Sequence, residues 1–217
     1  MPLNLTTDSD YMPHVRWMAS TSQWTMSSDG EQQPIQWETC LFDLENIKTG
    51  YGVFAEGCLP EWIWDADGKT AVVPADGREW KRGFSVNLYS PRTFGGDGVR
   101  EFASNLKGAM KGIKELYNLL YEPNAVAGQI PLVKYCGPRI ENSKNGFGGT
   151  SVPIFQIEKF IARPPAFDEA LLKYSEAVPQ APQVGIVMPP PVSHVVEAPP
   201  TPVVTAPIAP SVEPSEF

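Results

Sequence analysis

The sequence contains few of the residues from which catalytic and metal sites are built. Its 217 residues include two histidines, His14 and His194, and three cysteines without a CxxC pair. Neither a Ser-His-Asp triad nor a His-based metal site can be assembled from so few, and the wide cysteine spacing argues against a zinc site or a disulfide framework. We therefore expect no enzymatic activity, no cofactor and no metal.

Long apolar runs are also missing. No stretch of 18 apolar residues occurs, and the N-terminus carries Asp8 and Asp10 where a signal peptide would carry basic residues and an apolar run. These absences predict a soluble, cytoplasmic protein that makes no membrane contact.

Lysine and arginine are absent from the last part of the chain. All 17 of them lie between Arg16 and Lys173, whereas 11 of the 23 prolines lie from Pro179 onwards, interleaved with Val and Ala. Such a segment buries too little surface to offset its ordering entropy, and its prolines favour extended polyproline II. We expect one domain over residues 1–175 and a disordered Pro/Val/Ala-rich linker over residues 176–217.

The last residues of this tail combine carboxylates with a terminal aromatic ring. Glu213, Glu216 and the chain end offer negative charge to a basic cluster on a partner, while Phe217 fills an apolar pocket. The tip resembles the tails with which bacterial and phage single-stranded DNA-binding proteins recruit replication and recombination proteins. A proline-rich ligand for a groove-binding domain is the competing interpretation of the tail.

The body shows short segments rich in aromatic and β-branched residues, separated by turn signals such as Asp67-Gly68. In residues 83–89, Phe84, Val86 and Leu88 alternate with polar residues, which is typical of a strand with one buried face. Residues up to Glu31 lack clean periodicity and predict a loosely packed arm or a first strand. The expected strands are 36–44, 51–58, 62–64, 83–89, 130–136 and 153–161.

One long helix is expected over residues 98–121, because apolar residues recur there at spacings of three and four. On this helix Arg100, Lys107, Lys111 and Lys114 project to one arc and form a basic ridge. A mainly β fold with one long helix fits a β-barrel of the OB type with an open nucleic-acid-binding face. An α+β domain is the alternative.

Basic and aromatic residues concentrate between positions 78 and 114, a segment that contains eight Lys/Arg and only three Asp/Glu. Single strands are bound in this way, with cations on phosphates and rings stacked on bases. The candidate DNA-binding residues are Trp80, Lys81, Arg82, Phe84, Tyr89, Arg92, Arg100, Lys107, Lys111 and Lys114. Alternatively, the rings are core residues and the lysines a solvated helix face. Core packing is also favoured for Trp62 and Trp64, because Glu61 and Asp65 beside them would repel phosphate.

Several short motifs resemble a pattern found in phage-encoded replication proteins. They are Lys48-Thr49-Gly50-Tyr51-Gly52, Pro60-Glu61-Trp62, Lys81-Arg82-Gly83-Phe84, Gly98-Val99-Arg100-Glu101-Phe102, Val152-Pro153-Ile154-Phe155 and Arg163-Pro164. The resemblance, to phage single-stranded DNA-binding proteins with an OB-like domain, covers roughly residues 40–165 and implies coating of single-stranded DNA during replication and recombination. The oligomeric state is left open. The rival hypothesis is a viral structural or adaptor protein with a proline-rich interaction tail.

Overall fold

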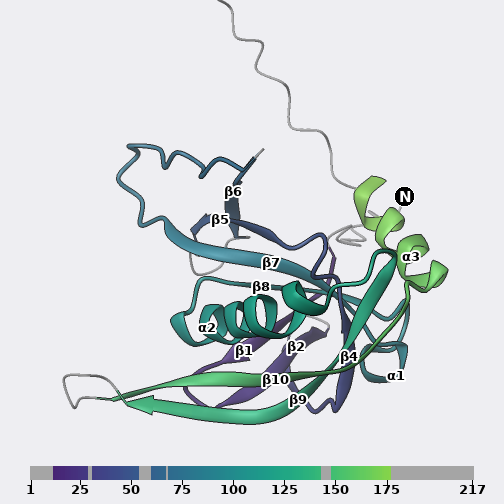
Figure 1. Cartoon of the computed structure of the whole chain (residues 1–217). Coiled ribbons are helices and arrows are strands. Elements are labelled where there is room, and N and C mark those ends of the chain that lie inside the picture. Colours follow the sequence, from purple (N-terminus) through teal and green to yellow (C-terminus); the bar gives the residue numbers. More distant parts are fainter. Residues whose placement is uncertain (1–11, 29–30, 54–59, 67, 143–147, 177–217) are drawn as a thin grey trace, which may run out of the picture. The chain divides into compact units, whose positions relative to one another are not determined.

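A ten-stranded mixed sheet dominates the structure, which is a computed structural model (Figure 1). The structure describes residues 12–28, 31–53, 60–66, 68–142 and 148–176. The strands are β1 (His14–Met18), β2 (Gln23–Ser28), β3 (Glu31–Ile35), β4 (Thr39–Phe42), β5 (Lys48–Val53), β6 (Glu61–Trp64), β7 (Lys81–Tyr89), β8 (Val99–Ser104), β9 (Gln129–Asn142) and β10 (Gly149–Ala162). The helical segments are α1 (Pro91–Phe94), α2 (Lys107–Glu115), the π-helical η1 (Leu116–Tyr121), the 3-10 turn η2 (Glu122–Asn124) and α3 (Pro165–Glu176).

Strand β7 is the hub of the sheet. The strand order is β10-β9-β4-β7-β8-β1-β2-β3, and β5 joins β7 from outside this path and carries β6 on its other side. We call these two strands the β5–β6 wing, which lies beside β7 in Figure 1. Only β1 and β8 pair in parallel among the described strands; the other pairs are antiparallel.

The prediction of a mainly β fold with few helices is confirmed. The segments expected at 83–89, 130–136 and 153–161 are strands, and the last two extend into the long β9–β10 hairpin. The sheet is open, with β3 and β10 at the two ends of the strand order, so closure into a barrel is not confirmed. The tail predicted from residue 176 lies outside the described residues, except for its first position at the end of α3.

The predicted helix over residues 98–121 is wrong in its first third. Val99–Ser104 is strand β8, held between β7 and β1, and the helix begins only at Lys107. The i, i+3 spacing of Val99 and Phe102 fits a helix equally well, but pairing on both edges of the segment outweighs that local pattern. Arg100 is therefore not part of a helical basic ridge.

The described residues 14–28 form the first two strands of the sheet, as the first-strand alternative predicted, and not a loose arm. Trp17 on β1 and Trp24 on β2 are almost completely buried, with ring centroids 5.3 Å apart. Trp24 also meets Phe102 on β8 edge to face at 4.8 Å. Aromatic rings of this size dominate the burial in a core, so the first two strands hold the centre of the fold together.

Helix α2 packs directly against the backbone of β10. A Cβ at Gly108 would overlap the carbonyl oxygen of Ser151, and one at Gly112 would lie 2.5 Å from the carbonyl oxygen of Pro153. Glycine lowers helix propensity, but here it permits the close approach that the two glycines suggested. This contact fixes the helix beside the sheet, where it forms one wall of the candidate site.

Helix α3 is tied to the loop before β8 by one side-chain hydrogen bond. The Tyr174 hydroxyl donates to Asp97, which also binds the Arg100 guanidinium. Burial and this hydrogen bond raise the pKa of Tyr174 to about 12. Burial would raise the pKa of Asp97, but the hydrogen bonds to its charged form outweigh burial and hold that pKa below its usual value. No helix in the described part of the chain is long and apolar enough to span a membrane.

Candidate nucleic-acid interface

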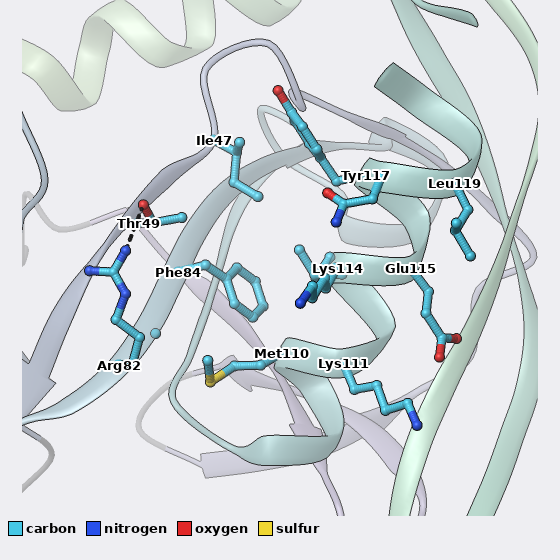
Figure 2. Close-up of a pocket in the computed structure, with 13 residues that line it drawn as sticks. Ile47, Thr49, Arg82, Phe84, Met110, Lys111, Lys114, Glu115, Tyr117 and Leu119 are labelled. Carbon is cyan, nitrogen blue, oxygen red and sulfur yellow. Dashed lines mark hydrogen bonds between the residues drawn. The ribbon is translucent and has the colours of Figure 1, made fainter. Parts of the chain in front are cut away.

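A groove of about 880 Å³ separates α2 and η1 from strands β5 and β7 (Figure 2). Strand alternation brings Arg82 and Phe84 of β7 to the same face, and the β5–β7 register places Thr49 opposite Phe84. Its lining residues are Ile47, Thr49, Arg82, Gly83, Phe84, Met110, Lys111, Ile113, Lys114, Glu115, Tyr117, Asn118 and Leu119.

The groove contains four of the residues predicted to bind DNA: Arg82, Phe84, Lys111 and Lys114. The sequence places them on two segments about 30 residues apart, and the fold brings the segments together. In Figure 2, Phe84 and Lys114 point into the space between helix and sheet, whereas Lys111 points toward the hairpin. Phe84 is only 3% exposed, so it forms part of the groove wall and offers little free ring surface.

Arg82 is held by a carboxylate that directly follows β6. Its guanidinium binds both oxygens of Asp65, with one N–O distance of 2.7 Å, and lies over the Tyr51 ring at 5.1 Å. The hydrogen bond from Arg82 holds the pKa of Asp65 well below its usual range, and the same bond raises the pKa of Arg82. A paired guanidinium adds little net positive charge to the groove, so Arg82 mainly positions the wing.

Lys111 is also paired, on the side of α2 that faces the hairpin. Its ammonium lies 2.5 Å from a carboxylate oxygen of Glu141 on β9, and Arg139 bridges Glu141 and Glu115. The hydrogen bond from Lys111 lowers the pKa of Glu141 most, and the one from Arg139 lowers it further. This network fixes the orientation of the helix and uses the charge of Lys111.

Lys114 is the groove cation whose charge is uncompensated. It is exposed, and among the described residues no carboxylate lies within ion-pair distance of it. Lys107, at the start of the same helix, is likewise exposed and unpaired in the described part of the chain, but it does not line the groove. Lys114 beside Tyr117 and Phe84 thus combines a free cation with aromatic and apolar surface.

Two other predicted residues are structural. Arg100, whose side chain is 12% exposed, donates to Asp97 and to the carbonyl oxygen of Phe94. Tyr89 stacks on Phe167 of α3, with centroids 5.1 Å apart. Neither side chain lines the groove.

The remaining predicted residues also lie outside the groove. Arg92 is exposed on the short helix α1. The Trp80 indole N–H donates to Asp76 at 3.1 Å, and Lys81 pairs with Glu79 at 3.1 Å. The partner-binding residues predicted at the tip, Glu213, Glu216 and Phe217, lie outside the described residues.

Sequence reasoning missed Tyr117 and Thr49 as lining residues. Tyr117 belongs to the apolar stripe that predicted the helix. The available signal was its position three residues after Lys114, which places the two side chains next to each other on a helix. Thr49 carried no signal of its own, since only the register of β5 on β7 brings it to the groove.

The groove offers binding groups rather than a reaction centre. The lining polar groups are one lysine without a carboxylate partner among the described residues, a hydroxyl, a phenol, an amide and the three paired charges of Arg82, Lys111 and Glu115, and no His or Cys is among them. Among residues that the structure describes, no three His, Cys, Asp or Glu side chains converge as a metal site would require.

Comparison with known proteins gives no relative to guide the assignment. No family model, curated protein or solved structure matches the chain. The functional argument therefore depends on the groove and its surroundings.

Proposed function

We propose that this chain is a single-stranded DNA-binding protein without base-edge specificity. The observation that carries the proposal is Lys114, an unpaired cation at the rim of a groove walled by Phe84, Met110 and Tyr117. A phosphate binds the Lys114 ammonium while sugar and base pack on the apolar wall, as in other single-strand sites that tolerate any sequence. Arg82, held by Asp65, keeps the other wall in place.

The wider role that fits this activity is phage DNA replication or recombination in the host cytoplasm. In this proposal the open, curved sheet takes the part that an OB-like barrel plays in other single-strand binders. The acidic-aromatic tip with Glu213, Glu216 and Phe217 recruits a replication or recombination protein. The motifs around Lys81-Arg82-Gly83-Phe84 and the composition of the tail support this role.

A direct binding titration tests the proposal. Labelled oligo(dT) is titrated with the full chain by fluorescence anisotropy, with duplex competitor and at several salt concentrations. We expect saturable binding that excess duplex does not displace and that weakens as salt rises. Absence of binding at low salt would overturn the proposal.

One observation favours the second candidate, a viral structural or adaptor protein. Lys81, Arg82, Arg100 and Lys111 are all paired with carboxylates, so the cluster of bases seen in the sequence is largely neutralised. An assembly protein needs no continuous positive surface. If oligo(dT) fails to bind and the chain self-associates in sedimentation, this second candidate is supported.

A further inference from the structure

Trp62 and Trp64 form a stacked pair on the edge strand of the β5–β6 wing. Their ring centroids are 4.5 Å apart and the ring planes are inclined by 10°. Both side chains are partly exposed, and neither belongs to the clusters of buried hydrophobic residues in the described part of the chain. The expectation of core packing is therefore wrong for this pair.

Three glycines clear the surface on which the two indoles lie. A Cβ at Gly52 would lie 2.8 Å from the Trp62 ring, and one at Gly83 would lie 2.7 Å from it. A Cβ at Gly50 would lie 3.0 Å from the Trp64 ring. At Gly52 the three nearest atoms all belong to the Trp62 indole, so the closest approach there is to the ring. The rings are thus seated on the sheet in a fixed position.

The carboxylates that flank the pair are neutralised by arginines. Glu61 lies 2.8 Å from the Arg78 guanidinium, and Asp65 is bound by Arg82. These arginines offset part of the repulsion of phosphate that the sequence suggested, most of it at Asp65, which is the less exposed of the two acids.

A lysine lies at each end of the pair on the same face of the sheet, Lys48 on β5 and Lys81 on β7. The register places Lys81 opposite Gly52, beside Trp62, and Lys48 lies two residues before Gly50, beyond Trp64. Lys48 is exposed with no carboxylate at ion-pair distance among the described residues. Among the described residues Lys81 pairs with the exposed Glu79, and such surface pairs hold their charges weakly.

We propose that the Trp62–Trp64 pair is a second base-stacking subsite for single-stranded DNA, with Lys48 and Lys81 contacting the flanking phosphates. This inference rests on the proposed function. Alternation along β5 and β7 puts this subsite on the opposite face of the wing from Thr49 and the groove. A strand that occupies both sites passes around β6, which is the outer strand of the wing among the described strands, so a long oligonucleotide engages the pair and a short one fills the groove alone.

Three variants of the full chain test the subsite with oligo(dT) of two lengths. Trp64→Leu removes the stack and keeps apolar volume, Trp64→Phe keeps a ring, and Gly52→Ala displaces the Trp62 indole without removing it. For the longer oligonucleotide we expect Trp64→Leu and Gly52→Ala to weaken binding on the order of 5- to 100-fold, and Trp64→Phe to recover most of it. The slope of binding against salt should stay unchanged in all three, because stacking releases no counterions.

The outcomes separate the subsite from the proposed function. If the unaltered chain does not bind oligo(dT), both proposals fall together. If it binds, and Trp64→Leu and Gly52→Ala bind the longer oligonucleotide equally well, only the subsite is overturned. Thermal melting of each variant identifies loss of folding. Should Trp64→Leu unfold, Gly52→Ala and Trp64→Phe decide the question alone: a loss in the first and recovery in the second support the subsite, and equal affinities overturn it.

Discussion

Replacing Lys114 by glutamine should weaken DNA binding in a salt-dependent way. Lys114 is the groove cation without a carboxylate partner among the described residues, so its loss removes one phosphate contact and breaks no ion pair. One contact to a single strand contributes about 0.7 to the slope of log Kobs against log salt concentration. Taking 1 M salt as reference, the variant should bind about fivefold more weakly at about 0.1 M salt and about fifteenfold more weakly at about 0.02 M.

The assay is a salt series of oligo(dT) titrations on Lys114→Gln and on a matched control. Lys173→Gln removes the same charge from an exposed site on α3, outside the groove. The control should keep the slope of the unaltered chain, and both variants should keep its stability, because exposed substitutions of this kind change it by about 0.5 kcal/mol or less. Equal loss in the two variants would show that net charge matters rather than the groove. An unchanged slope in Lys114→Gln would refute the assignment.

Two further predictions concern the scaffold of the site. Gly108→Ala should lower the free energy of unfolding by about 1–3 kcal/mol in urea titrations, because its Cβ would overlap the Ser151 carbonyl. Helix propensity alone favours a higher free energy of unfolding for this variant, and such an increase would contradict the α2–β10 contact. Tyr174→Phe should cost about 1–3 kcal/mol at neutral pH by losing the bond to Asp97. The pKa of Tyr174 is raised from 10.0 to about 12, so its contribution is complete below pH 10 and lost as the pH rises through 12. Across that pH range the melting temperature of the unaltered chain should fall, and that of the variant should fall less.

The strands with strict alternation could be predicted from the sequence, because burial on one face of a sheet imposes a period of two. Phe84, Val86 and Leu88 showed this period of two in the sequence, and all three lie in the core. Val99 and Phe102 did not, since their spacing satisfies a helix as well as a strand, and only the neighbouring strands β7 and β1 decide between them. Short strands such as β1 carry too few residues for a period to emerge.

The candidate site was predictable as a neighbourhood but not as a charge distribution. Proximity in sequence correctly joined Arg82 and Lys114 to one surface. The net charge around Arg82 and Lys111 depends on acids from distant segments: Asp65 lies 17 residues before Arg82, and Glu141 lies 30 residues after Lys111. Such pairings follow from strand register and helix docking, which local composition does not encode. For the same reason the two acids beside the Trp62–Trp64 pair looked repulsive in the sequence.

The neutralised bases have a consequence for how the protein binds its ligand. Within the two proposed binding sites, Lys114 in the groove, Lys48 on β5 and Lys81 on β7 are the described residues whose charge a phosphate can recruit without breaking a strong ion pair. Two or three contacts give a salt slope of only about two, whereas contacts from all eight clustered bases would give a slope of about five to six. Most of the affinity must then come from stacking, which contributes on the order of 1–3 kcal/mol per base and is insensitive to salt. Binding that survives high salt fits this balance. A slope of about five or more would mean that DNA displaces the carboxylates from their arginine and lysine partners, and would contradict it.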